Sequence, residues 1–291
     1  MPVGRISVLR ALRVVTLVLL VVFGGLGILL GVGVDRLRGR DPLAGAGRWA
    51  QALWCRTCCR VLGVRLRTTG EGIAPGPVLL LANHISWLDI ICLAAMAPVT
   101  FLSKSEVRGW PIVGRVASAL GTVYIDRGRD RAAERARAAI AESLAAGRRL
   151  VLFAEGTTGP GDTVRPFRPR LVQAALDAGT LVQPVTICYR NAAGGACRSV
   201  AFLDDQGLLA SVWGVAGEAG LEAVVMPHAP LTPEAGRTAV TRESHRRVSE
   251  GLNALLDGAA LSQSRHMSFP IMRPESTAGD RNGCEHSDRR G

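Results

Sequence analysis

The sequence predicts an α/β protein with a mostly parallel sheet flanked by helices, preceded by an N-terminal helical segment that anchors the chain to a membrane. Three observations lead to this prediction. Short apolar runs alternate with helical patterns, as in a parallel sheet covered on both faces. The 291 residues can bury one substantial core but not two large ones. A long uncharged apolar run lies near the N-terminus, at residues 14–34.

The apolar run at residues 14–34 would reach roughly 31 Å as a helix, which is long enough to cross a bilayer. Arginines flank it in equal number on both sides, so the charge asymmetry that normally sets orientation is absent and the topology stays open. A cleaved signal peptide would have a shorter run and a small-residue cleavage site, which Gly31-Val32-Gly33 matches poorly. We therefore predict a retained anchor.

A second helical pattern follows at residues 43–62, where apolar side chains recur at spacings near three and four among arginines. It predicts an amphipathic helix that lies on the membrane, or that folds back on the first helix as a hairpin without spanning. A helix of the globular core is the alternative. The predicted organisation is an anchor with its amphipathic helix at residues 1–62, a globular domain at 63–262 and a disordered polar tail at 263–291.

Within the globular part, short apolar runs predict buried strands and longer patterns predict helices. The predicted strands are residues 78–82, 99–102, 122–125, 150–153, 181–189 and 223–226. The predicted helices are residues 88–96, 110–120, 129–146, 171–178 and 238–256. In folds of this class the functional loops gather at strand ends, so residues that directly follow a strand are the first candidates for a site.

Charge, cysteines and absent motifs narrow the function classes. The formal net charge of +11 would suit nucleic acid, an anionic bilayer or a phosphate-bearing substrate, and the apolar N-terminus favours the membrane, so no nucleic acid partner is expected. The seven cysteines form neither a disulfide framework nor a complete zinc site, which predicts a reduced protein without a metal. The nucleotide-binding, serine hydrolase and zinc peptidase motifs are missing from the sequence.

His84 directly follows the first predicted core strand, and Asp89 comes five residues later. On one continuous helix these side chains would point about 140° apart. They meet only if His84 lies on the turn before the helix and Asp89 reaches back from its first turn, which an N-cap at Ser86 would allow. A carboxylate on one imidazole nitrogen leaves the other free to deprotonate an alcohol. The structural alternative is a capping box, because Ser86 and Asp89 have its spacing.

Two further charged side chains end predicted strands. Arg127 closes a segment that runs from Gly121, and its guanidinium is suited to binding a phosphate. Glu155 ends the next strand within a glycine-containing turn, and Pro184 interrupts the strand after that. Taken singly, Arg127 is more often a solvated surface residue and Glu155 a turn residue. Their joint placement at strand ends indicates a site.

In this order, the segments resemble the motifs of the glycerophospholipid acyltransferases of the 1-acylglycerol-3-phosphate acyltransferase type. In that family a histidine and an aspartate form the catalytic pair, matched here by His84 and Asp89. A second motif ends in an arginine that contacts the acceptor's phosphate, matched by Arg127. A third helps to bind the acceptor and a fourth is a proline in an apolar strand, matched by residues 153–158 and by Pro184.

The resemblance covers roughly residues 50–230 and implies that residues 63–262 form a glycerolipid acyltransferase domain. It also implies which side chains contact the substrates. Acceptor binding is implied for Arg127, Glu155, Gly156 and Thr157, and additional substrate contacts for Asn83, Lys104, Arg165 and Arg168.

The implied reaction moves a fatty-acyl group from acyl-CoA or acyl-carrier protein to the free hydroxyl of a lysolipid, with His84 as general base and no cofactor. The expected acceptor is 1-acyl-sn-glycerol-3-phosphate, a lysophospholipid, which gives phosphatidic acid. Thr158 stands where many members have arginine, and the segment from Glu155 is similar to a bacterial branch that acylates lyso-ornithine lipid, which is the alternative acceptor. A lipid hydrolase and a non-enzymatic lipid-binding protein are further alternatives. The expected location is the bacterial inner membrane, with the site at its cytoplasmic face.

Overall fold

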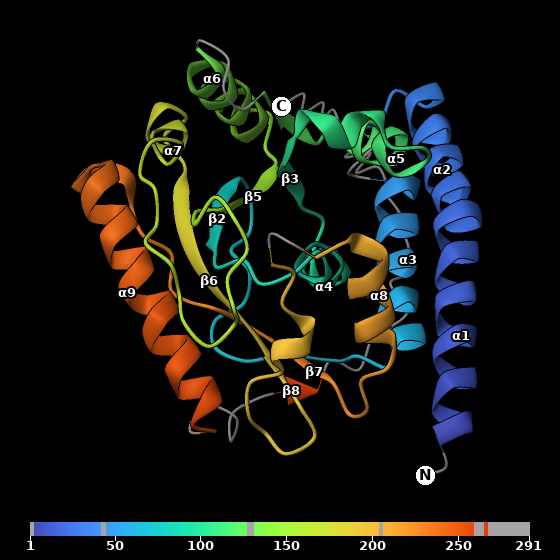
Figure 1. Ribbon diagram of the computed structural model, residues 1–291. Coiled ribbons are helices and arrows are strands. Elements are labelled where there is room, and N and C mark those ends of the chain that lie inside the picture. The colour runs from blue at the N-terminus through green and yellow to red at the C-terminus, as the bar shows by residue number, and fades with distance from the viewer. Residues whose placement is uncertain (1–2, 42–44, 127–130, 204–205, 259–264, 267–291) are drawn as a thin grey trace, which may run out of the picture.

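The computed structural model describes residues 3–41, 45–126, 131–203, 206–258 and 265–266. At its centre is an eight-stranded sheet of order β4-β3-β5-β2-β6-β7-β1-β8 (Figure 1). The strands are β1 (Arg65–Thr68), β2 (Val78–Ala82), β3 (Thr100–Lys104), β4 (Val123–Ile125), β5 (Arg149–Phe153), β6 (Leu181–Arg190), β7 (Glu222–Pro227) and β8 (Arg265–His266). Neighbours run parallel except at β6–β7 and β1–β8, which confirms the predicted, mostly parallel sheet.

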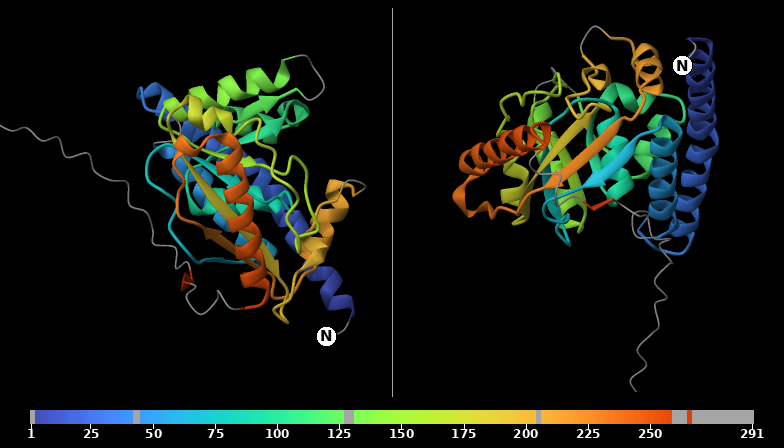
Figure 2. Two further views of the ribbon diagram at one scale, coloured as in Figure 1. Left: turned by 90° about the vertical axis from the view of Figure 1, so that its left-hand side faces the viewer. Right: turned by 90° about the horizontal axis from the view of Figure 1, so that it is seen from below.

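Helices cover both faces of the sheet, with α3, α4 and α8 on one side and α6, α7 and α9 on the other (Figures 1 and 2). Their bounds are α3 (Ala46–Leu62), α4 (Leu88–Met96), α5 (Val113–Ala119), α6 (Ala132–Ala145), α7 (Gln173–Asp177), α8 (Leu208–Ala216) and α9 (Arg237–Leu256). Strand β2 is apolar throughout because both of its faces are covered. Leu79 and Leu81 belong to the core under α6 and α9, and Val78, Leu80 and Ala82 to the core under α3 and α4.

The N-terminal helix is longer than the predicted apolar run. Helix α1 (Val3–Leu19), a π-helical turn at Leu20–Gly24 and α2 (Gly25–Leu37) follow one another without a break. Within them, Val8–Leu37 is long and apolar enough to cross a membrane. This single apolar helix agrees with the predicted anchor segment.

Helix α3 folds back along α2, as one of the two predicted arrangements required (Figure 1). The carboxylate of Asp35 accepts hydrogen bonds from the backbone N–H of Ala46 and Gly47, at 2.9 and 2.7 Å, and so fixes the start of α3. The Trp54 indole donates to the carbonyl of Leu20 at 2.7 Å. Gly24 is needed there, because a Cβ at that position would overlap the Trp54 ring.

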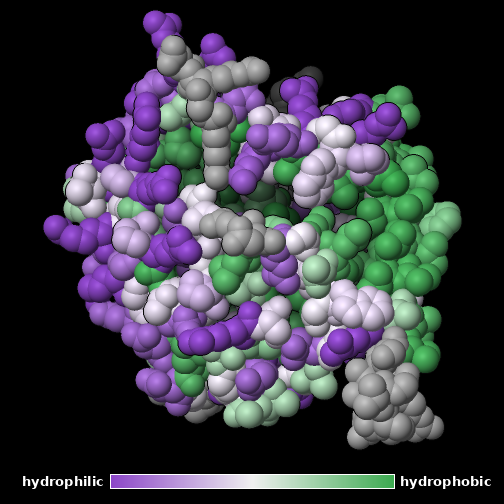
Figure 3. All heavy atoms as spheres, viewed as in Figure 1, coloured by the Kyte–Doolittle hydropathy of each residue, from purple (hydrophilic) through white to green (hydrophobic). Residues whose placement is uncertain are grey.

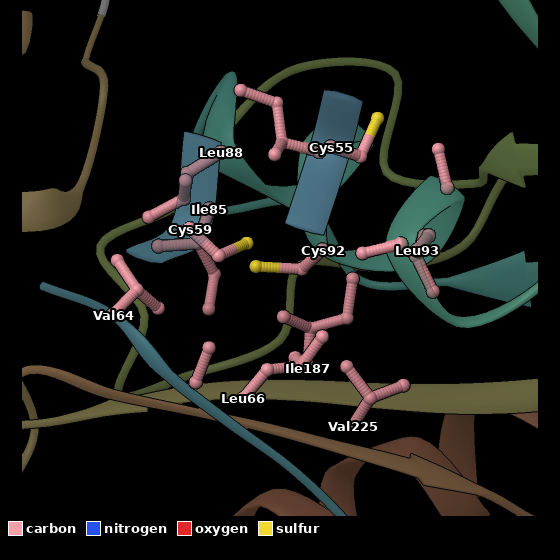
Figure 4. Close-up of a cluster of buried hydrophobic side chains, with 14 of the residues drawn as sticks. Cys55, Cys59, Val64, Leu66, Ile85, Leu88, Cys92, Leu93, Ile187 and Val225 are labelled. Carbon is pink, nitrogen blue, oxygen red and sulfur yellow. The ribbon is translucent and has the colours of Figure 1, made fainter. Parts of the chain in front are cut away.

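The other side of α3 belongs to the main core, so the helix has features of both predicted alternatives. Cys55 and Cys59 of α3 belong to the same buried cluster as Cys92 of α4, and Figure 4 shows the sulfur atoms of Cys59 and Cys92 directed toward each other. The cysteines within the described ranges are buried free thiols. The hydrogen bond with Cys59, together with burial, raises the pKa of the Cys92 thiol.

The observed elements differ from the predicted ones in several places. Helix α5 is shorter than predicted, β1 and α8 were not predicted, and the first residues of the helix predicted from 129 lie outside the described ranges. Of the tail predicted to be disordered, the structure describes only β8. Pro184 lies inside β6, as predicted for a proline within the strand at residues 181–189, and the strand continues through it. The missing N–H of Pro184 faces the edge where pairing with β7 ends at Pro227, and its carbonyl still accepts from His228 N at 2.9 Å.

Candidate active site

His84 lies in the turn between β2 and α4, and Asp89 reaches back to it from the first turn of the helix. The distance from His84 Nδ1 to Asp89 Oδ2 is 2.7 Å. The same oxygen accepts from the backbone N–H of Ile85 and Ser86, at 2.7 and 3.0 Å. The predicted meeting of the two side chains is therefore present, and it is built by a carboxylate that caps the turn.

The predicted side-chain cap by Ser86 is wrong. Its hydroxyl is buried and has no hydrogen-bond partner among the described residues. The backbone amide of Ser86 is taken by Asp89 instead, which makes the aspartate both the cap of the turn and the partner of the imidazole. The capping role and the contact with His84 are thus not alternatives.

Tyr189, near the end of β6, is the partner of Asp89 that the sequence reasoning missed. Its hydroxyl donates to Asp89 Oδ1 at 2.8 Å, and the two residues are only 2% and 0% exposed. Burial raises the pKa of the Tyr189 phenol well above its usual value, so the hydroxyl keeps its proton and donates. One signal was available, since Tyr189 shares the core-facing side of β6 with Val185 and Ile187 and is the polar member of that row.

The imidazole of His84 is held by two side chains. It stacks on the ring of Phe153, with centroids 3.9 Å apart and planes 10° from parallel. Asp89 occupies Nδ1, which leaves Nε2 as the acceptor, and His84 lines a large cavity. Asn83, the residue before His84, does not line the cavity. Its side-chain amide donates to Ile187 O and accepts from Ile187 N, at 2.9 and 2.7 Å, which ties the end of β2 to β6.

Glu155 holds the backbone of His84. Its carboxylate is 3% exposed and accepts from His84 N at 2.7 Å and from Arg165 N at 3.0 Å. Burial raises the pKa of Glu155, and the two N–H donors oppose that shift. The loop that follows adds a further contact, from Gly159 N to His84 O at 2.7 Å. These contacts make Glu155 a positioning residue, and direct contact with an acceptor stays a prediction.

The remaining predicted contacts fall into two groups. Lys104, Gly156, Thr157 and Arg168 line the same cavity as His84, and Gly156 lies against the Arg168 guanidinium. Arg165 contributes its backbone N–H to Glu155 but does not line the cavity. Arg127 lies outside the described residues.

Thr158, which stands at the position where an arginine was expected, has a structural contact. Its hydroxyl donates to the carbonyl of Phe202, whose own N–H donates to Ile85 O at 2.9 Å. The loop after β5 and the segment before α8 are thereby fastened to the turn that carries His84. In place of a cation, the threonine supplies this link.

The cavity measures about 1290 Å³ and has both polar and apolar walls. Its polar and charged lining includes Lys104, Thr157, Arg168 and Arg170, and the Phe153 ring that stacks on His84 also lines it. Residues of the N-terminal helices line it as well. The apolar walls include Leu17, Val21, Ile28, Trp54, Ile91, Phe101, Val113 and Val116. Such a space is suited to a long apolar chain whose polar end lies at His84. Within the described ranges, no three side chains of His, Cys, Asp or Glu are grouped to hold a metal ion.

Comparison with known proteins agrees with this geometry. The sequence pattern of the acyltransferase family matches residues 65–188, which contain β2, the turn with His84 and the loop with Glu155. A lyso-ornithine lipid O-acyltransferase from Pseudomonas aeruginosa is 44% identical over 188 residues, covering 63% of this chain and 69% of that protein. One from Brucella abortus is 36% identical over 72% of this chain and 84% of that protein.

Two further similar proteins are named for another acceptor. A 1-acyl-sn-glycerol-3-phosphate acyltransferase from Neisseria gonorrhoeae is 36% identical over 48% of this chain and 54% of that protein. The crystal structure of the 1-acyl-sn-glycerophosphate acyltransferase from Thermotoga maritima has the same fold, with a TM-score of 0.66 over 86% of this chain and 96% of that one, at 20% identity. The chain is therefore an acyltransferase and belongs to the family of lysolipid acyltransferases that these proteins represent.

Proposed function

We propose that His84 is the general base and Asp89 its positioning partner in the transfer of a fatty-acyl group from a thioester to a lysolipid hydroxyl. The observation that carries the proposal is the 2.7 Å contact between His84 Nδ1 and Asp89, with the other nitrogen left as acceptor on a residue that lines the cavity. Asp89 fixes the tautomer and stabilises the imidazolium that forms when the proton moves.

In the proposed reaction the acceptor oxygen attacks the thioester carbon as Nε2 of His84 takes the hydroxyl proton. The carbon–sulfur bond then breaks, and the thiolate leaves and takes the proton back from the imidazolium. An ester bond forms and a thiol is released, so atoms and charges balance without an acyl-enzyme. We propose that no cofactor takes part and that acyl-CoA or acyl-carrier protein is the co-substrate. The apolar part of the cavity supports binding of the acyl chain in a position that brings the thioester to His84.

For the acceptor we propose lyso-ornithine lipid, with 1-acyl-sn-glycerol-3-phosphate as the second candidate. This chain matches 69% and 84% of the length of two relatives named for lyso-ornithine lipid. It matches 54% of the gonococcal relative named for 1-acyl-sn-glycerol-3-phosphate. Thr158 stands where a phosphate-binding arginine was expected, which also favours lyso-ornithine lipid. The second candidate is favoured by Arg168 and Arg170 in the cavity wall, since guanidinium groups bind phosphate well.

The apolar N-terminal helix and the lipid acyltransferase relatives indicate that the protein associates with a membrane. We propose that it does so at the cytoplasmic face of the bacterial inner membrane, without spanning it. Helix α2 packs along α3 and α5, so a spanning helix would draw both into the hydrocarbon. The outward side of the N-terminal helix is apolar instead, with Val8, Leu12, Phe23 and Leu30 exposed. That pattern supports a helix that lies in one leaflet.

The test uses membranes that contain the protein, a radiolabelled acyl thioester and a panel of lysolipids. We expect His84→Gln to lower turnover by about 10²- to 10⁴-fold while binding of the lysolipid persists. His245→Gln is the matched control, because His245 packs edge-on against Phe167 on the other side of the sheet. Wild-type turnover by His84→Gln would refute the mechanism. Acylation of lysophosphatidic acid alone would select the second acceptor, and release of free fatty acid would indicate a hydrolase.

A further inference from the structure

Helix α8 has an apolar outer side that nothing in the described chain covers. Its sequence from Leu208 to Ala216 contains no charged residue. The inner side is buried at Ser211 and Val215, whereas Leu209 is 82% exposed and Trp213 43% exposed. A soluble surface rarely presents a leucine and a tryptophan together on an uncharged helix, and tryptophan is enriched where membrane and water meet.

This outer side of α8 adjoins the apolar surface of the N-terminal helix. The Arg13 guanidinium of α1 donates to Ala216 O, at the end of α8, at 2.9 Å and to Glu218 O, just beyond it, at 3.2 Å, and so holds the two helices together. Figures 1 and 2 show α8 beside the first turns of α1. Figure 3 shows apolar side chains gathered over the N-terminal helices, to which α8 is joined.

The inner sides of the same two elements wall the cavity of His84. On one side lie Leu208 and Val212 of α8, and on the other Leu17 and Val21 of the N-terminal helix. Helix α8 is also tied to the reactive turn, because the Trp87 indole between His84 and Asp89 donates to Ser211 Oγ at 3.0 Å.

We propose that α8 is a second membrane-inserted element, with Leu209 and Trp213 in the lipid, and that the lysolipid reaches His84 from the bilayer between α8 and the N-terminal helices. The occupant of the outer face is the bilayer because that face continues the surface already assigned to lipid. The access route rests on the proposed function, whereas the insertion of α8 does not. A lysolipid that moves this way keeps its acyl chain in apolar surroundings throughout.

Insertion is tested with a fluorescent label at Leu209→Cys in a Cys284→Ser background, where the cysteines of the described ranges are buried. Asn253→Cys on the exposed side of α9 is the matched control. Each labelled protein is reconstituted in vesicles of phosphatidylethanolamine and phosphatidylglycerol. We expect nitroxide-bearing lipid to quench the label at 209 at least fivefold more than the label at 253. We expect iodide to quench the label at 253 at least fivefold more than the label at 209. Equal quenching by iodide at both positions would overturn insertion of α8.

The access route is tested with Leu209→Gln, since Leu209 does not line the cavity. We expect the KM for a long-chain lysolipid presented in vesicles to rise about fivefold, with the kcat for a short-chain lysolipid in detergent unchanged. An unchanged KM in vesicles would overturn the route even where the label reports insertion. Absence of acyl transfer to every lysolipid in detergent would refute the proposed function instead, and the quenching result would still decide the insertion.

Discussion

Replacement of Tyr189 by phenylalanine removes one hydroxyl from a buried network and leaves the ring in place. The Tyr189 hydroxyl lies 2.8 Å from Asp89 Oδ1 and donates a hydrogen bond to it. The other oxygen, Oδ2, keeps its contacts with His84 and with the N–H groups of Ile85 and Ser86. Tyr189→Phe therefore weakens the support of the aspartate without abolishing it.

The magnitude follows from the type of bond that is lost. A hydrogen bond to a charged group contributes about 1.5–3 kcal/mol, so the free energy of unfolding should fall by about that amount. If the same energy were lost in the transition state, turnover would fall by about 10- to 150-fold. Because two backbone amides still hold Asp89, we expect the lower end, about tenfold in kcat. Burial keeps the pKa of Tyr189 above its ordinary value, so this ratio should stay constant between about pH 6 and 9.

The matched control is Thr186→Val, an equally small change on the opposite side of the same strand. Its hydroxyl donates to Val248 O at 3.1 Å and contacts His228 Nε2 at 2.8 Å, away from Asp89. The assay measures initial rates in detergent micelles at saturating thioester and lysolipid, and thermal unfolding for both variants. We expect both to lose stability and only Tyr189→Phe to lose kcat. A Tyr189→Phe enzyme with wild-type kcat, or equal losses of kcat in both, would refute the reasoning.

Three further predictions concern other parts of the network. In Glu155→Gln the side-chain NH₂ must face one of the two backbone N–H donors, which loses a hydrogen bond at an expected cost of about 1–3 kcal/mol. The kcat should therefore fall at least several-fold, and a wild-type kcat would contradict the positioning role. Arg168→Met should raise the KM for the acceptor more than that for the thioester, and steady-state kinetics would reveal the opposite order if the assignment is wrong. Burial lowers the pKa of His228 to about 4, below its usual 6.5, so the unfolded chain takes up a proton first as the pH falls. Stability should therefore fall further in wild type than in His228→Gln between pH 6.5 and 4, by less than about 3 kcal/mol because solvent screens the half-buried ring, and parallel unfolding curves would exclude this.

The sheet and the turn that carries His84 could be predicted from sequence because both depend on local patterns. Runs such as residues 78–82 are apolar at every position, and only a strand covered on both faces requires that. The backward reach of Asp89 followed from helix geometry once His84 was placed before the helix. Both arguments use residues within one turn or one strand of each other.

The missing parts depend on contacts between distant segments. Tyr189 meets Asp89 across 100 residues of sequence, and nothing near either residue specifies that pairing. The carboxylate of Glu155 faces backbone amides because the loop after β5 wraps around the turn of His84, an arrangement that residue types alone do not define. Helix α8 was missed since a nine-residue apolar segment fits a strand or a helix equally well.

The position of His84 along the cavity bears on how two unlike substrates meet. A lysolipid is held in a bilayer, whereas the acyl-CoA or acyl-carrier protein that we propose as donor would arrive from water, so a site for both needs apolar and polar walls. The cavity that His84 lines has both, with Lys104 and Arg168 among its charged residues and side chains of the N-terminal helices among its apolar ones. The end of β2 places His84 in this cavity, and Asn83 ties that end of the strand to β6. A base on a mobile loop would lose this alignment, and the effective concentration of the two reactants at His84 would fall with it.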